Sequence, residues 1–142
     1  EASPLEFFNH PKREKTIAFV RKLKTYTYES TVEDIDIYTV LAQVSSYCSK
    51  YAFTPKVANR VRLVAEELLT GLQPIGGEGM VNLTVAYEET TGKKEVVLRH
   101  NITNKAFKVL DELSEMIIKN CAADIQYDNE NGYRVLTVCI KE

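Results

Sequence analysis

Glu67 is the residue whose type and position most favour chemistry. On a helix predicted over residues 55–72, at 100° per residue, Arg60, Glu67 and Gly71 fall together on the flank of the apolar stripe centred on Val61. A carboxylate at the margin of a core can serve as a general base, because partial desolvation makes it more basic. An ion pair with Arg60, or plain solvation, accounts for the same position without chemistry, and spacing alone favours this simpler interpretation.

The cysteines and histidines form no comparable cluster. Cys48, Cys121 and Cys139 are far apart and odd in number, and neither they nor His10 and His100 have the spacing of metal ligands. We therefore predict no metal site, and we expect the cysteines to be small core hydrophobes in a reducing, cytoplasmic compartment. The sequence shows no signal peptide and opens without Met, as an excised fragment would.

Composition is that of an ordinary globular domain. The 142 residues, 44% of them hydrophobic and 27% charged, suffice for one domain with a core. The longest apolar run, residues 17–20, is far too short to cross a bilayer. A net charge of −2 gives no general attraction to nucleic acid, so we expect no nucleic-acid partner. The charge is uneven, however: residues 1–24 carry +3 and the remainder −5, which predicts two segments of different character.

Hydrophobic periodicity predicts the elements that must position Glu67. Alternation predicts strands, and repeats of three and four residues predict helices. The expected order is a strand over 25–32, helices over 35–51 and 55–72, a Gly-rich break, a hairpin of 81–87 and 95–100, a helix from Thr103 or Asn104 to Cys121, and a hairpin of 125–127 and 133–140 around Asn131-Gly132. This order predicts a two-layer α/β (α+β) sandwich, with a mixed, mostly antiparallel sheet and helices on one face.

Two amphipathic segments carry more detailed expectations. In the helix ending at Cys121 we expect an inner face of Ala106, Val109, Leu110, Leu113, Met116 and Ile117. Upstream of the body, Pro11 opens a helix to about Lys24, with Thr16, Phe19, Val20 and Leu23 on one side and Lys and Arg on the other. That stripe is too narrow to form a core alone. It must dock on the body or on a part outside this sequence.

The second half of the helix predicted over 55–72 reads Arg62-Leu63-Val64-Ala65-Glu66-Glu67-Leu68-Leu69-Thr70-Gly71-Leu72. It lies between an amphipathic helix and a Gly-rich loop that leads into a hairpin. In this setting residues 25–142 resemble the histidine-kinase-like ATPase fold, most closely its anti-sigma-factor kinase branch. The resemblance implies a Glu that polarises the attacking water or hydroxyl, and an Asn four residues later that holds Mg²⁺. Glu67 matches the first, whereas Gly71 stands in the place of the second and has no side chain to coordinate a metal.

A second family motif is missing. The resemblance implies Asp-x-Gly-x-Gly, whose Asp reads the adenine amino group, after the strand ending near Arg99, but residues 99–104 read Arg-His-Asn-Ile-Thr-Asn. Asn101 could hydrogen-bond a base, and a later Gly-rich lid is absent too. We therefore interpret the body as a degenerate member of the family, in which Glu67, Gly71, Arg99 and Asn101 mark a vestigial nucleotide or ligand cleft with no catalytic residue and no metal ligand.

Residues 1–24 carry a separate resemblance. The resemblance rests on the run Ser3-Pro4-Leu5-Glu6-Phe7-Phe8-Asn9-His10-Pro11-Lys12-Arg13-Glu14-Lys15-Thr16-Ile17-Ala18-Phe19-Val20-Arg21-Lys22-Leu23. This run is similar to the C-terminal tail of ATP-binding subunits of polar-amino-acid ABC transporters, except that His10 replaces an Asn. It implies an upstream ATPase domain that binds ATP and Mg²⁺. The phosphate-binding G-x-x-x-x-G-K-[ST] loop of such a domain is not found in these 142 residues.

Together the resemblances imply a non-catalytic C-terminal accessory domain of an amino-acid ABC transporter ATP-binding protein. It would comprise a helical tail over 1–24 and a regulatory domain over 25–142, and it would sense a small molecule or mediate subunit association. Its expected partners are the ATPase domain, the membrane subunits, a small-molecule effector and a second copy, at the cytoplasmic side of the inner or plasma membrane, with no cofactor in these residues. Two alternatives stay open: a divergent ATP-binding anti-sigma-type kinase or ATPase with Glu67 as base, and a purely structural dimerisation module.

Overall fold

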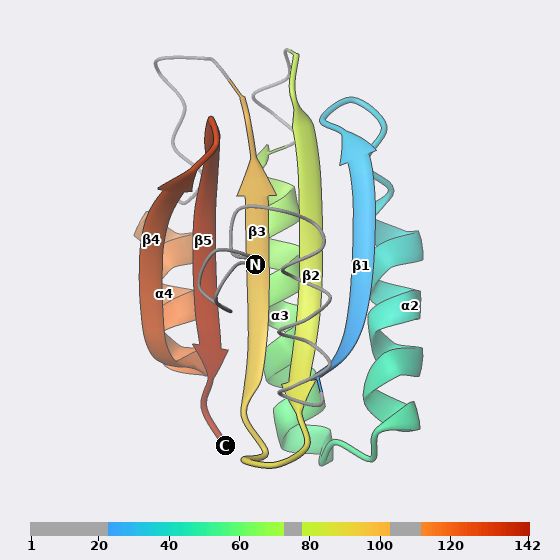
Figure 1. Cartoon of the computed structure of the whole chain (residues 1–142). Coiled ribbons are helices and arrows are strands. Elements are labelled where there is room, and N and C mark those ends of the chain that lie inside the picture. The colour runs from blue at the N-terminus through green and yellow to red at the C-terminus, as the bar shows by residue number, and fades with distance from the viewer. Residues whose placement is uncertain (1–22, 73–77, 103–111) are drawn as a thin grey trace, which may run out of the picture.

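The computed structural model describes residues 23–72, 78–102 and 112–142. In this part of the chain, five strands form one sheet and three helices cover one of its faces (Figure 1). The elements are β1 (Leu23–Thr31), α2 (Ile37–Lys50), α3 (Pro55–Leu72), β2 (Met80–Glu88), β3 (Lys94–His100), α4 (Glu112–Cys121), β4 (Ala122–Glu130) and β5 (Tyr133–Ile140). The predicted two-layer α+β sandwich is confirmed.

The sheet has the strand order β1-β2-β3-β5-β4, and every neighbouring pair is antiparallel. Both predicted hairpins, β2–β3 and β4–β5, are present. Asn131 and Gly132 have positive φ angles of 52° and 83°, the conformation that a tight Asn-Gly hairpin turn requires. The expected mostly antiparallel sheet is therefore antiparallel throughout.

The core lies between the helices and one face of the sheet. Helix α3 runs behind the centre of the sheet, between α2 and α4 (Figure 1). Thr54 caps α3 by accepting a hydrogen bond from the amide of Val57 at 3.2 Å, and Pro55 takes the first helical position, as the sequence predicts. All six residues of the predicted stripe on this helix are buried: Val57, Val61, Val64, Ala65, Leu68 and Leu72.

The first strand begins earlier than predicted. It starts at Leu23 rather than Thr25, because Leu23 and Lys24 already pair with Glu88 and Tyr87 of β2. The helix expected up to about Lys24 therefore does not extend through these two residues. Cross-strand hydrogen bonding with a distant segment decides their conformation, and the local pattern does not contain that information.

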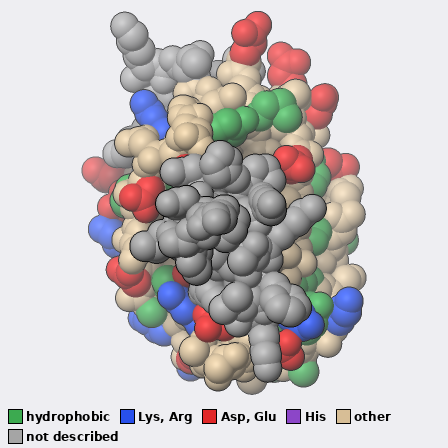
Figure 2. Space-filling model, viewed as in Figure 1, with side chains coloured by type: hydrophobic (Ala, Val, Ile, Leu, Met, Phe, Trp, Pro, Cys, Tyr) green, Lys and Arg blue, Asp and Glu red, His purple; other side chains and the backbone are tan. Residues whose placement is uncertain are grey.

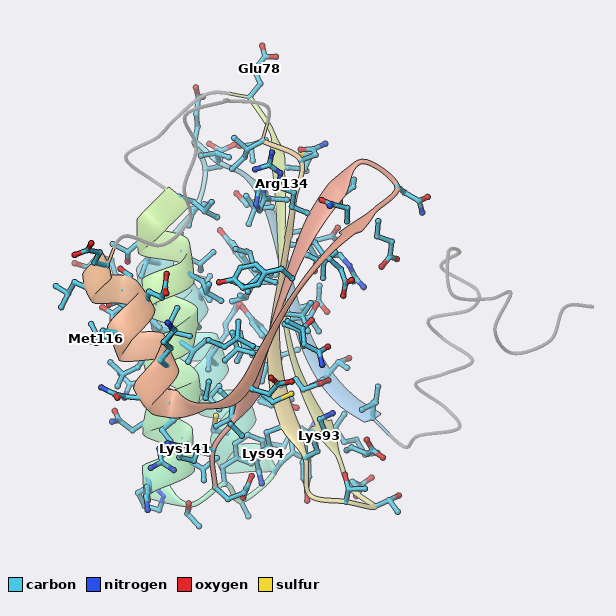
Figure 3. All side chains as sticks on the ribbon, turned by 90° about the vertical axis from the view of Figure 1, so that its left-hand side faces the viewer. Glu78, Lys93, Lys94, Met116, Arg134 and Lys141 are labelled. Carbon is cyan, nitrogen blue, oxygen red and sulfur yellow. The ribbon has the colours of Figure 1, made fainter. Side chains whose placement is uncertain are left out.

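Helix α4 turns a different face to the core than predicted. Leu113 and Met116 are 67% and 58% exposed, whereas Ile118 and Cys121 are buried. Met116 points away from the rest of the molecule (Figure 3). The expected inner face is wrong for Leu113 and Met116, because the helix is rotated so that Ser114 faces α3. Ala106, Val109 and Leu110 lie outside the described residues, and Ile117 is half-buried.

Two of the three cysteines are core residues. Cys48 and Cys121 are buried, as predicted, and burial raises the pKa of the Cys48 thiol to about 11. Cys139 is only half-buried and lies on the face of the sheet opposite the helices, so the prediction is wrong for it. Strand alternation causes the difference, since Val138 and Ile140 point to the helices and the residue between them points away.

Candidate functional site

Glu67 is engaged by a hydroxyl from the neighbouring helix. Its Oε1 atom accepts a hydrogen bond from Ser114 Oγ at 2.8 Å, and both residues are half-buried between α3 and α4. The sequence analysis missed Ser114. One signal could have found it. Ser114, Ile118 and Cys121 are spaced four and three residues apart, which places Ser114 on the same, buried side of α4 as Ile118 and Cys121.

Arg60 does not pair with Glu67 in the described part of the chain. Its Nη1 atom donates to the backbone carbonyl of Lys141 at 2.8 Å instead. Seven residues separate Arg60 from Glu67, which corresponds to a rise of about 10 Å along the helix. The guanidinium therefore fastens the end of β5 to α3, and the simple ion-pair interpretation is replaced by the contact with Ser114.

The structure brings two of the four predicted cleft residues together. Gly71 follows Glu67 by one helical turn, so the two share one side of α3. Arg99 lies on the opposite face of the sheet. On β3 the buried residues Val96 and Leu98 point to the helices, and alternation directs Arg99 away from them.

Asn101 has a local structural partner. Its Oδ1 atom accepts a hydrogen bond from the amide of Met80 at 2.6 Å, where β2 begins and β3 has just ended. This bond closes the open end of the β2–β3 pair. The oxygen that could have read a base therefore has a structural role at the start of β2. The four predicted cleft residues lie in three separate places: Glu67 and Gly71 on α3, Arg99 on the opposite face of the sheet, and Asn101 just after β3.

His100 precedes Asn101 and points into the core. It is 3% exposed, and its Nδ1 atom accepts a hydrogen bond from the amide of Ile102 at 3.4 Å. Burial, together with the positive charge of Arg134 on β5, lowers the pKa of His100 to about 4. The imidazole is therefore neutral at physiological pH, and its position in the core makes it a structural group.

A surface cavity of about 380 Å³ lies between the N-terminal turn of α2 and α3. Asp36, which lines it, caps α2: its carboxylate accepts from the amide and hydroxyl of Thr39 at 3.1 and 2.8 Å, and these bonds lower its pKa. The sequence analysis did not single out this cavity. Its lining combines two carboxylates, two hydroxyls and apolar groups: Ile35, Asp36, Ile37, Tyr38, Leu41, Glu66 and Thr70.

The start of β1 is fastened to the far end of α2. Tyr47 donates its hydroxyl to the carbonyl oxygen of Lys24 at 2.5 Å, and its ring packs against Phe53 with a centroid distance of 5.7 Å. Burial raises the pKa of Tyr47 well above its ordinary value. Lys24 also forms an ion pair with Glu89 at 3.5 Å. The first residues of the described body are thus held from two sides.

No family model matches the chain, and no curated protein matches it either. In the described ranges, none of the helices combines the length and apolar character needed to cross a membrane.

Proposed function

We propose that this chain is a non-catalytic regulatory module that follows the ATPase domain of an amino-acid ABC transporter, built on a histidine-kinase-like ATPase fold without its nucleotide chemistry. The observation that carries the proposal is the fastening of Lys24 to Tyr47 at the point where the transporter-like tail enters β1. A tail that is joined to a body without slack transmits movement in either direction.

Helix α2 provides a mechanical route from the surface cavity to this junction. Its N-terminal residues line the cavity, and Tyr47 near its other end holds Lys24. Ile37 and Tyr47 are about 15 Å apart along the helix axis. A ligand that shifts the first turn of α2 would therefore displace the tail, and through it the two ATPase subunits relative to each other.

The former nucleotide side of the fold supports a non-catalytic role. Glu67 already accepts a hydrogen bond from Ser114, Gly71 offers no metal ligand, and Arg99 lies on the other face of the sheet. Phosphoryl transfer depends on a metal ion that neutralises the phosphate charge. The residues that would hold such an ion in the family are not at their positions in this sequence.

Two experiments test the proposal. The coding sequence upstream of residue 1 should encode an ABC nucleotide-binding domain, and a different upstream domain would refute the transporter assignment. In the full-length protein, Tyr47→Phe should weaken the response of ATP hydrolysis to the transported amino acid while basal hydrolysis is retained. Tyr127→Phe, on an exposed tyrosine of β4, is the matched control and should leave the response unchanged.

Calorimetry separates the proposal from its rivals. Titration of the 142-residue chain with amino acids and nucleotides should give heat with an amino acid and none with ATP. Micromolar ATP binding that needs Mg²⁺ and is lost in Glu67→Ala would instead establish a kinase or ATPase. A two-fold assembly that buries well over about 1,000 Å² and binds no ligand would establish a dimerisation module.

A further inference from the structure

The sheet has a second face that none of the described helices covers. Seen edge-on, the helices lie on one side of the strands only (Figure 3). Strand alternation and register arrange the residues of this uncovered face in rows across the sheet. The two central rows are Thr25, Ala86, Glu95, Cys139, Asp124 and Thr27, Thr84, Val97, Thr137, Gln126.

The middle of the uncovered face consists mostly of small side chains, with one carboxylate, Glu95, among them. Thr27 and Thr84 lie hydroxyl to hydroxyl at 3.4 Å, and Val97 and Thr137 continue their row. Ala86 and Val135 are each only 7% exposed, the same as Tyr47 in the main core. Sheet faces that meet water usually carry polar and charged side chains along their length. The burial of Ala86 and Val135 on a face that none of the described helices covers favours a surface against which another element packs.

The rim of the same face is acidic. The strand residues of the face include one arginine, Arg99, and six carboxylates. Five of the carboxylates, Glu29, Glu88, Asp124, Asp128 and Glu130, lie toward the rim, and Glu95 lies in a central row. Glu95 is paired with Lys93 at 3.3 Å. In the view onto this face, acidic side chains appear along the border on the side of β4, with basic side chains among them (Figure 2). A partner with an apolar centre and basic flanks would complement this surface.

Residues 11–22 of this chain have that character. They contain five basic residues and one acidic residue, and the apolar side chains of Phe19 and Val20 share one side of the helix predicted there. Leu23, the last residue of the predicted stripe, is the first residue of β1, and alternation places its side chain on the uncovered face. The stripe therefore enters the body at the border of the surface that complements it.

We infer that residues 11–22 dock on the uncovered face of the sheet as an amphipathic helix, with Phe19 and Val20 over the small residues of its centre. A helix of this length spans about 18 Å. The row from Thr25 to Cys139 crosses three strand spacings, or about 14 Å. The segment is thus long enough to cover β1, β2, β3 and β5. The inference concerns this chain alone and does not depend on the transporter assignment.

Cys139 reports on this docking, because it lies in the row of the uncovered face that the docked segment would cross. Cys48 lies in the main core and serves as the internal reference. Modification of the full 142-residue chain by N-ethylmaleimide, resolved by peptide mass spectrometry, gives both rates in one experiment. Phe19→Asp/Val20→Asp should accelerate modification of Cys139 about tenfold or more, since two apolar side chains no longer hold the contact closed. Ala18→Asp, on the opposite side of the same helix, is the matched control and should leave the rate unchanged.

An unchanged Cys139 rate in the double variant, with Cys48 still protected, overturns the inference. If Cys48 also becomes reactive, the double variant has disturbed the main core. Changes of charge then provide the test. Glu29→Lys/Asp128→Lys, at exposed rim positions that are not cross-strand neighbours of Cys139, should accelerate Cys139 at low salt. In the unmodified chain, 0.5 M salt, about three times the physiological ionic strength, should accelerate it too. No change in either case overturns the inference. Protection of Cys139 that falls on dilution also overturns it, because the occupant would then be a second copy.

Discussion

Ser114 of α4 donates a hydrogen bond to Glu67 of α3 at 2.8 Å, across 47 positions of the sequence. The bond accompanies the rotation of α4 that turns Leu113 and Met116 to the solvent. The same rotation buries Ile118 and Cys121 and brings the Ser114 hydroxyl to the half-buried carboxylate. An apolar and a polar contact thus favour one rotation of this helix.

Removing this hydroxyl should loosen α4. We expect Ser114→Ala to lower the free energy of unfolding by about 1–3 kcal/mol, because it leaves the Glu67 carboxylate partly buried without its donor. Glu67→Gln keeps an acceptor oxygen and should cost less than about 1 kcal/mol. Urea denaturation of the three proteins measures the difference. Equal stability of Ser114→Ala and the unmodified chain would contradict the role of this bond.

The rotation of α4 makes its own prediction. Ile118→Ala should lower the free energy of unfolding by about 2–4 kcal/mol, because Ile118 is fully buried. Met116→Ala, also a truncation of a large apolar side chain on the same helix, should change it by about 0.5 kcal/mol or less, because the residue is 58% exposed. Thermal unfolding compares the two. The reverse order would restore the inner face expected from the sequence.

His100 should make stability fall as the pH falls. Its pKa of about 4 in the folded chain lies below the ordinary 6.5, so the unfolded chain binds the proton first. The penalty is absent above pH 7, begins near pH 6.5 and grows until about pH 4; between pH 7.5 and 5 it amounts to about 2 kcal/mol. Urea denaturation across this range should show a shallower pH dependence for His100→Gln. Parallel curves for the two proteins would exclude His100 as the cause.

Most of the fold could be predicted from local patterns. The apolar stripe of α3, the Thr54-Pro55 start and the Asn131-Gly132 turn each follow from residues within a few positions of one another, and the structure confirms them. The start of β1 could not be predicted in this way. Leu23 fits a helical stripe and a strand equally well, and only its pairing with Glu88 of β2 selects the strand.

The candidate cleft was harder to predict than the fold. Helical spacing places Glu67 and Gly71 on one side of α3, because that spacing is local. Arg99 and Asn101 were selected for their position after a strand, and this position does not say which face of the sheet a residue takes. Val96 and Leu98 on β3 are buried against the helices. Because side chains alternate along a strand, Arg99 points away from α3.

Lys94 packs on two aromatic rings and also forms an exposed ion pair, and we expect the packing to contribute more to the free energy of unfolding. Its ammonium lies 5.1 Å from the ring centre of Phe53 and 5.3 Å from that of Tyr87, and it contacts Glu142 at 3.2 Å. The lysine side chain is 11% exposed and the glutamate 64%.

Lys94→Met should therefore lower the free energy of unfolding by about 1–2 kcal/mol, whereas Glu142→Gln should change it by about 0.5 kcal/mol or less. Denaturation at 0.05 and 0.5 M salt, below and above physiological ionic strength, checks this, since only the exposed pair is strongly screened. An equal loss in both variants would assign the stabilisation to the ion pair.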